Sequence, residues 1–303
     1  VSERNLPDRD SALATFGVEL DRTFPSLEAP QRRVAEAFEA LSGLARRSIG
    51  APLGRAILLR TIEDALGGSL PLPDRFPIQI QSDRNEINER SLEIDASAFS
   101  GREGKFPRSE EWADDLIAPL DRTARWLRSH GVPRIALSGS YRLTTALVIG
   151  WSLRAAIGFE LVIPTREGAW ATDDRPSSGD PAPAWHITEP TALHGDQLVI
   201  SVAVLRDPAV DLLQTAGIPA ESVLKLFLDA PITSAKSAQA GVSVIKRAAD
   251  TAVARLRPKG IQLFFAGPAA FAVALGHRWN AMPLTQLHEF VTGNRVYVDT
   301  AQI

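Results

Sequence analysis

Tyr141 and Arg142 are the residues of this sequence whose types and positions best suit the binding of a phosphorylated ligand. They lie in S-G-S-Y-R-L-T-T, residues 138–145, where an apolar run ends and a helix of small residues begins. A guanidinium holds phosphate through paired hydrogen bonds, a phenol ring stacks on a base, and the hydroxyls of Ser140 and Thr144 donate hydrogen bonds. The bland alternative is that Ser140 caps the helix while Arg142 is solvated.

The strand–glycine–helix pattern around these residues occurs twice, and we call this repetition the sequence echo. R-I-A-L-S-G-S-Y-R-L-T-T-A-L-V-I-G, residues 134–150, has a degenerate counterpart in G-I-Q-L-F-F-A-G-P-A-A-F-A-V-A-L-G, residues 260–276. Gly139 and Gly267 mark the turns, and a second glycine closes each helix. At the second turn Gly267 permits close backbone approach and Pro268 fits the first helical position, so this turn offers backbone N–H groups and shape; tight helix–sheet packing is the alternative. We therefore predict one asymmetric site between two diverged halves.

Other polar residues follow strand-like runs and belong to the same predicted edge. Arg206 and Asp207 come directly after the apolar run 198–205, although Asp207 also suits a helix cap. Pro231 and Lys236 lie in the loop after the run 223–228, and a lysine at a helix start is unfavourable for the helix dipole unless it meets an anion. Trp170, in the polar stretch 164–196, is expected to stack on a base if exposed, or to pack beneath the loop.

No constellation of catalytic residues accompanies these candidates. The sequence contains no G-x-S-x-G, no phosphate-binding G-x-x-x-x-G-K-[ST], no H-E-x-x-H and no full G-x-G-x-x-G. Its five histidines form no helical metal pair. We expect no catalytic residue, no metal and no cofactor, and hence a domain that senses a ligand without converting it.

The elements that must position these residues alternate between strand and helix. Residues 1–75 are predicted to be mostly helical, with helices over 31–48 and 54–66 and a Gly/Pro-rich boundary at 67–77. A helix capped by Ser109 is predicted to run to His130. The alternation after it predicts an α/β fold with mostly parallel sheets over 76–303, ending in an antiparallel edge hairpin. The expected strands are 76–80, 92–94, 135–137, 159–163, 198–205, 223–228, 261–265, 285–291 and 296–301, and the later helices are 142–157, 208–216, 234–257 and 268–278.

Composition excludes several classes of protein. The 303 residues carry a net charge of −3, so no global attraction to a nucleic-acid backbone is expected. There is no cysteine for disulfides or thiolate chemistry. No apolar run reaches 18 residues and no secretory leader is recognisable, so we expect a cytoplasmic protein without membrane contact. The chain begins at Val1 and its single methionine is Met282, which leads us to expect a piece of a longer protein.

The order of the motifs resembles the SAVED domain of bacterial CBASS anti-phage effectors. The resemblance covers residues 76–303 and rests on S-L-E-I-D-A-S-A-F-S-G (91–101), P-R-S-E-E-W (107–112), R-I-A-L-S-G-S-Y-R (134–142), the Trp170 loop, I-Q-L-F-F-A-G-P-A-A-F-A-V-A-L-G (261–276) and W-N (279–280). Residues 1–75 are similar to the helical region that follows the nuclease in nuclease–SAVED effectors, and the nuclease itself is absent from this chain.

This resemblance implies two fused CARF-like Rossmann-type halves that bind a cyclic oligonucleotide, typically a cyclic trinucleotide such as cyclic tri-AMP, made by a partner CD-NTase. It also implies that binding drives self-association and activates an attached nuclease against double-stranded DNA. Only the turns Gly139–Arg142 and Gly267–Pro268 match motifs of the family; Trp170, Arg206 and Lys236 rest on their position at the sheet edge.

Two other functions remain open from the sequence. One is an α/β enzyme acting on a nucleotide or nucleotide-sugar, with residues 164–196 as a lid, and the other is a purely structural oligomerisation module. Turnover of a cyclic trinucleotide would favour the enzyme, and tight binding without turnover would favour the receptor. If the chain neither binds nor converts the trinucleotide, the structural module is favoured.

Overall fold

The computed structural model describes residues 8–24, 27–48, 55–68, 70, 75–81, 91–101, 105–166, 168–174, 183–205, 208, 217–291 and 296–303. The chain folds as two compact units, one comprising Val1–Phe76 and Trp126–Val132 and the other Pro77–Arg125 and Pro133–Ile303. A short piece from the middle of the chain therefore belongs to the N-terminal unit.

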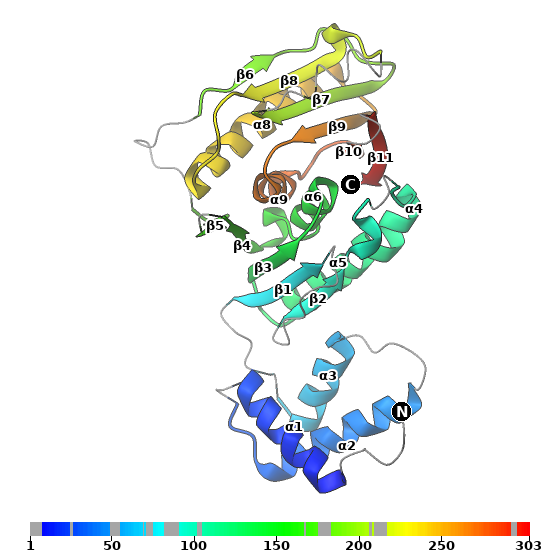
Figure 1. The fold of residues 1–303 in the computed structure, drawn as a ribbon, viewed down its shortest axis with the longest axis vertical. Helices are drawn as coiled ribbons and strands as arrows, with labels where there is room; N and C mark the ends of the chain where they lie inside the picture. The colour runs from blue at the N-terminus through cyan, green and yellow to red at the C-terminus, as the bar shows by residue number, and fades with distance from the viewer. Residues whose placement is uncertain are drawn as a thin grey trace. The chain divides into compact units, whose positions relative to one another are not determined.

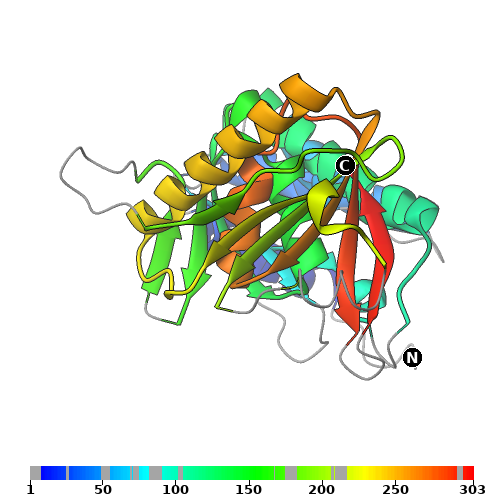
Figure 2. The same cartoon turned by 90° about the horizontal axis from the view of Figure 1, so that it is seen from above.

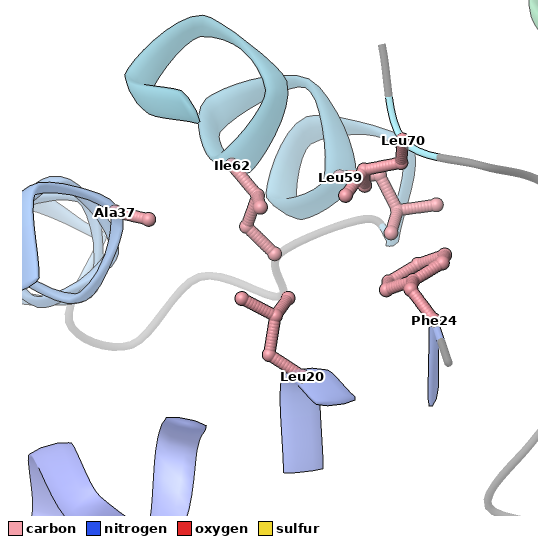
Figure 3. Close-up of a cluster of buried hydrophobic side chains, with 6 residues drawn as sticks. All are labelled: Leu20, Phe24, Ala37, Leu59, Ile62 and Leu70. Atoms are coloured by element: carbon pink, nitrogen blue, oxygen red, sulfur yellow. The ribbon is translucent and has the colours of Figure 1, made fainter. Parts of the chain in front are cut away.

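The first unit is helical. It contains α1 (Arg9–Thr23), α2 (Gln31–Arg47) and α3 (Arg55–Leu66). Their apolar faces meet in a core that Phe24 and Leu70, just beyond the ends of α1 and α3, complete. The core consists of Leu20, Phe24, Ala37, Leu59, Ile62 and Leu70 (Figure 3), and Trp126 packs against it. Burial of these side chains supplies the main stabilisation of helices that are too short to persist alone in water.

The second unit contains two mostly parallel sheets, which confirms the predicted fold class. The first sheet has the order β2-β1-β3-β4-β5, and the second has the order β11-β10-β9-β7-β8-β6. Parallel pairing joins β1 to β2, β3 to β4, and β7 to both β8 and β9. The strands are β1 (Phe76–Gln81), β2 (Leu92–Asp95), β3 (Arg134–Ser140), β4 (Glu160–Thr165), β5 (Gly168–Ala171), β6 (His186–Thr188), β7 (Gln197–Val204), β8 (Val223–Leu228), β9 (Gly260–Ala266), β10 (Thr285–Val291) and β11 (Val296–Gln302).

The two sheets repeat one topology. Read in the same direction, the second sheet is β6-β8-β7-β9-β10-β11, so β7 to β11 follow the strand order of β1 to β5 with β6 added at the edge. Each series ends in an antiparallel pair, β4–β5 or β10–β11. Helix α6 (Leu143–Ser152) follows β3 as α9 (Ala269–Arg278) follows β9. The sequence echo thus marks equivalent positions in two halves of one unit.

Helices α6 and α9 lie side by side between the two sheets (Figure 1). A Cβ added to Gly150 would lie 2.1 Å from the carbonyl oxygen of Val273, and one added to Gly276 would lie 2.1 Å from that of Leu147. The contacts are reciprocal, because Gly150 aligns with Gly276 and Leu147 with Val273 in the echo. These glycines were predicted to close their helices, yet each lies two residues inside its helix; their role is close helix–helix approach.

Two further helical segments cover the sheets. Between β2 and β3 the chain forms α4 (Ser109–Trp112), a π-helical turn (Ala113–Ile117) and α5 (Ala118–Ser129). The long α8 (Ala235–Leu256) contacts α9 and strand β7 and crosses the molecule obliquely in Figure 2. Ser109 is the first helical residue and its hydroxyl donates to the Thr300 carbonyl oxygen at 2.7 Å, so the prediction that Ser109 caps this helix is wrong.

Two other boundaries differ from the sequence prediction. The stretch 164–196, predicted as one polar loop, contains the edge strands β5 and β6. The helix predicted over 142–157 ends at Ser152 and is followed by a 3-10 turn, Ala155–Ile157. The helix predicted over 208–216 lies almost entirely outside the described residues.

Candidate functional site at the carboxyl ends of the strands

Gly139 brings the end of β3 close to the backbone of β1. Its φ is +96°, and an added Cβ would lie 1.9 Å from the carbonyl oxygen of Ile80. A side chain is therefore excluded both by conformation and by space. Ser140, the last residue of β3, is exposed beside it.

Tyr141 and Arg142 link β3 to α6. Both side chains are half-buried. Desolvation raises the pKa of the Tyr141 phenol to about 12. Arg142 is the N-cap residue of α6 but makes no side-chain cap; its Nε donates to the carbonyl oxygen of Ser100 at 2.7 Å, and its guanidinium lies over the Phe106 ring at 5.8 Å. The guanidinium is thus held in one place.

Thr144 was predicted to offer a hydrogen bond to the ligand, but the structure uses its polar groups internally. The residue is 1% exposed. Its backbone N–H donates to Glu289 Oε2 at 2.8 Å, and its hydroxyl lies 3.2 Å from that of Thr300. Because the Thr300 hydroxyl donates to the Leu287 carbonyl oxygen, the Thr144 hydroxyl is the donor to Thr300. In this structure both polar groups of Thr144 are therefore engaged within the protein, and its contact with a ligand stays a prediction.

Glu289 is the residue that sequence reasoning missed. It is 4% exposed on β10, and its carboxylate caps α6 from the second half of the unit. Burial raises its pKa, opposed by the hydrogen bond from the Thr144 backbone N–H and by the positive charge of Arg142. The sequence did contain a signal: in the alternating strand 285–291, Glu289 falls on the same inward face as Leu287 and Val291.

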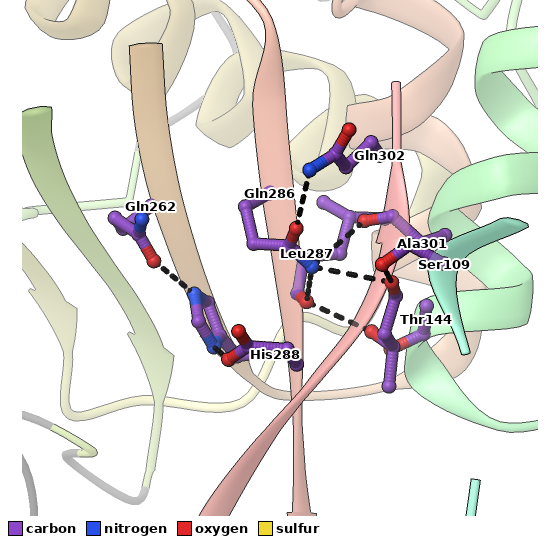
Figure 4. Close-up of polar contacts among 10 residues, drawn as sticks. Ser109, Thr144, Gln262, Gln286, Leu287, His288, Ala301 and Gln302 are labelled. Carbon is purple, nitrogen blue, oxygen red and sulfur yellow. Dashed lines mark hydrogen bonds and ion pairs between the residues drawn. The ribbon is translucent and has the colours of Figure 1, made fainter. Parts of the chain in front are cut away.

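The contact between Glu289 and Thr144 shows how the carboxyl ends of the strands in the two sheets are placed relative to each other. Glu289 lies toward the carboxyl end of β10, whereas Thr144 lies at the start of α6, just after the carboxyl end of β3. Figure 4 shows Thr144 directed at the β10–β11 hairpin. The carboxyl edges of both sheets therefore meet on one side of the unit, which is where open α/β sheets bind ligands.

The second turn lies on that side as well. Gly267 follows β9, and an added Cβ would lie 3.2–3.3 Å from side-chain atoms of Phe265 and Val204, so helix–sheet packing accounts for part of its role. Pro268 is exposed and is the N-cap of α9, not its first helical residue as predicted. It provides no side-chain cap, and α9 has no acidic residue in its first turn.

Residues after β8 complete the edge of the second sheet. Pro231 and Lys236 are exposed, and Lys236 is the second residue of α8, behind an N-cap formed by Ser234. Since β7, β8 and β9 are parallel neighbours, these residues share the edge with Gly267. Arg206 and Asp207 lie outside the described residues.

Trp170 is placed differently from the exposed stacking residue that was predicted. It belongs to β5, pairs with Ile163 of β4, and is 9% exposed. Trp170 therefore lies on an edge strand and not in a free loop. Its side chain is packed against the protein, as the alternative expectation had it.

Two hollows lie at the other end of α9. One of about 530 Å³ is lined by α8, including Lys246 and Arg247, by Arg278 at the end of α9, and by Asn280. The other, of about 200 Å³, is bordered by Trp151, Arg154 and Trp279. Arg278 ends α9, so both are separated from the turn at Pro268 by the length of that helix.

Among the described residues, no group of three or more His, Cys, Asp or Glu side chains is arranged to hold a metal ion. Within that same part of the chain, no helix is long and apolar enough to cross a bilayer.

Comparison with known proteins assigns the fold to a family. Residues 118–303 match the sequence model of SAVED, the "SMODS-associated and fused to various effectors sensor domain". The chain belongs to the SAVED family. This match covers more than half of the 303 residues and includes both turns of the candidate site.

Relatives of this SAVED chain are found among CD-NTase-associated proteins. CD-NTase-associated protein 4 from Moraxella osloensis is 24% identical over 99% of this chain and 63% of its own length. The corresponding protein of Acinetobacter sp. (strain ATCC 27244 / 9458) is 24% identical over 75% of this chain and 49% of its own. The chain thus spans about half to two thirds of these relatives.

Solved structures share the fold. The Acinetobacter baumannii Cap4 SAVED/CARF-domain containing receptor with the cyclic trinucleotide 2'3'3'-cAAA superposes with a TM-score of 0.68 at 21% identity, covering 98% of this chain and 67% of that one. The Moraxella osloensis Cap4 receptor gives 0.64 at 22% identity, covering 98% and 66%.

Proposed function

We propose that this SAVED chain is a receptor for a cyclic oligonucleotide, with a cyclic trinucleotide such as cyclic tri-AMP as its ligand. The observation that carries the proposal is the meeting of both carboxyl edges on one side of the unit. Arg142 and Tyr141 lie at one turn, and the start of α9, whose N-cap residue Pro268 makes no side-chain cap, lies at the other. The similar Acinetobacter baumannii receptor has been solved with 2'3'3'-cAAA and with 3'3'3'-cAAA, which supports this ligand class.

Different residues of the site contact different parts of the ligand. Arg142, held by Ser100 and Phe106, contacts a phosphate, and Tyr141 stacks on a base. Gly267 and Pro268 let backbone N–H groups approach the ligand, and Lys236 adds a positive charge at the same edge. Ser140 donates a hydrogen bond from the end of β3. With Trp170 buried, Tyr141 is the aromatic contact we assign.

The proposal extends to the longer protein. Binding of a messenger made by a CD-NTase drives self-association in the cytoplasm, and this activates an attached nuclease that cleaves double-stranded DNA. The names of the relatives connect them to CD-NTases, which is the support for this step.

Binding is tested with a panel of cyclic di-, tri- and tetranucleotides by thermal shift and calorimetry. A ligand at 100 times its Kd stabilises the folded state by about 2.7 kcal/mol, so a tight ligand is readily seen. Arg142→Ala should weaken binding by about 1–3 kcal/mol, or roughly 5- to 150-fold, while Arg142→Lys should recover part of it. Arg247→Ala, on α8 beside the hollow at the other end of α9, is the control and should bind as the wild type does.

Three outcomes would contradict the proposal. Hydrolysis of the bound trinucleotide would favour a nucleotide-processing enzyme, and binding of no panel member would favour a structural module. Unchanged affinity in Arg142→Ala would remove Arg142 from the site. Light scattering on the same samples tests self-association, which should increase with ligand and not without it.

A further inference from the structure

Glu289 occupies the position that a bound anion would take at the start of α6. The first N–H groups of a helix carry partial positive charge and seek an acceptor. In α6 the N-cap residue, Arg142, makes no side-chain cap and the first turn has no acidic residue. The Glu289 carboxylate reaches from β10 to fill this role at 2.8 Å from the Thr144 nitrogen.

The surrounding hydrogen bonds hold this arrangement in place. The Thr144 hydroxyl donates to Thr300, Thr300 donates to the Leu287 carbonyl oxygen at 2.8 Å, and Ser109 donates to the Thr300 carbonyl oxygen at 2.7 Å. Figure 4 shows these contacts converging on the hairpin. The polar groups of Thr144 are thus directed to the second half of the unit. With Glu289 only 4% exposed, moving its carboxylate away would leave a buried acid without its partner.

The other half has no matching carboxylate on the equivalent strand. Ile135 of β3 pairs with Leu161 of β4, and the equivalent Ile261 of β9 pairs with Thr285 of β10. Counting along from these pairs, the counterpart of Glu289 on β4 is Thr165, which is uncharged and whose hydroxyl donates to the Gly168 carbonyl oxygen at 3.2 Å.

We infer that Glu289 is a positioning residue that closes the start of α6 to ligand phosphate and leaves the Arg142 side chain as the anion contact of the first half. This inference rests on the proposed function. It makes the two halves chemically unequal: one contacts a phosphate through a guanidinium, and the other through backbone N–H groups at the turn beside Pro268. A cyclic ligand would then bind in a preferred orientation.

The Thr144 amide tests the closed helix start directly. In protein labelled with 15N-threonine, its NMR signal should stay in place, and its exchange should stay slow, when cyclic tri-AMP or inorganic phosphate is added to the wild type. In Glu289→Ala without ligand, the amide should exchange at least about tenfold faster, and inorganic phosphate should shift its signal.

Ligand affinity tests the positioning role. Glu289→Gln keeps an oxygen acceptor for the Thr144 N–H and removes a negative charge near Arg142, so cyclic tri-AMP should bind about 3- to 10-fold more tightly with the amide still protected. Glu160→Gln, which removes a carboxylate from the start of β4, is the charge-matched control and should leave affinity unchanged.

The results separate this inference from the proposed function. A wild type that binds no cyclic oligonucleotide refutes the function, while the response of Thr144 to inorganic phosphate still decides whether Glu289 closes the helix. Loss of Thr144 protection in the wild type on ligand binding would show that the ligand displaces Glu289. Weakened binding in Glu289→Gln would show that the carboxylate contacts the ligand. Either result overturns the inference.

Discussion

Arg142 illustrates how neighbouring residues turn a flexible side chain into a fixed one. A free arginine loses considerable rotamer entropy when it binds a phosphate. Here its Nε is already bonded to the Ser100 carbonyl oxygen, and its guanidinium lies over Phe106. Part of the ordering therefore precedes ligand binding.

At the same scale, Tyr141 should titrate later than an exposed tyrosine. Desolvation raises the pKa of its phenol to about 12 from 10.0. Because the folded-state pKa is the higher one, the contribution to stability is present below pH 10 and is lost as pH rises toward 12. Ultraviolet titration of the folded protein to pH 11 should leave Tyr141 mostly neutral.

Two variants assign that signal, since the chain contains two tyrosines. Tyr141→Phe should remove the late absorbance change, whereas Tyr297→Phe should retain it, and denatured protein should show none. A late change that persists in Tyr141→Phe would contradict the desolvation of this phenol.

Among the elements, the crossing of α6 and α9 joins the two halves. Both glycines at the crossing allow backbone-to-backbone contact, and the contacts lie at the same spacing from the start of each helix. Larger residues would separate the helices and pull the hydrogen bond between Thr144 and Glu289 apart. The crossing is therefore a structural requirement for the site as well as for stability.

Gly150→Ala and Gly276→Ala should each destabilise the protein by about 1–3 kcal/mol, because an added methyl group would overlap a carbonyl oxygen 2.1 Å away. Gly17→Ala in α1 is the control; its Cβ would meet Val34 at 3.8 Å, so the usual helical gain of about 0.5–1 kcal/mol is expected. Chemical denaturation followed by circular dichroism measures all three. Equal stabilisation of all three variants would refute the close crossing.

On the scale of the whole molecule, residues near the end of α5 belong to the N-terminal helical unit. His130 donates to the carbonyl oxygen of Trp126 at 2.8 Å and to Glu63 at 2.9 Å. Desolvation lowers the pKa of His130, but these two acceptors outweigh it and the net direction is upward. Both ring nitrogens face acceptors, so the doubly protonated imidazolium suits the site.

Stability of the helical unit should therefore fall as pH rises through the pKa of folded His130. The contribution is fully present below the pKa of the unfolded state, near 6.5, because the folded-state pKa is the higher one. Glu63→Gln should cost about 1–3 kcal/mol at pH 6 and reduce the pH dependence. Thermal melts between pH 5 and 8 measure this, with Glu160→Gln as the charge-matched control. A variant with the wild-type pH profile would contradict the assignment.

Local patterns in the sequence determined much of this protein. Alternating apolar runs and helices predicted the parallel sheets and the final hairpin, because backbone periodicity and turn chemistry are local properties. The echo predicted two diverged halves, and Gly139, Tyr141 and Arg142 were found from the turn itself. Their roles in ligand binding stay predictions.

Only the tertiary structure decided which groups remain available to a ligand. Glu289 and Thr144 are 145 residues apart in the chain, and no local rule pairs a strand carboxylate with a distant helix start. Trp170 is 9% exposed on β5, an edge strand that pairs with β4 and that sequence composition did not reveal. The echo glycines serve the helix crossing for the same reason: a glycine's use depends on what packs against it, and the folded chain alone brings those partners together.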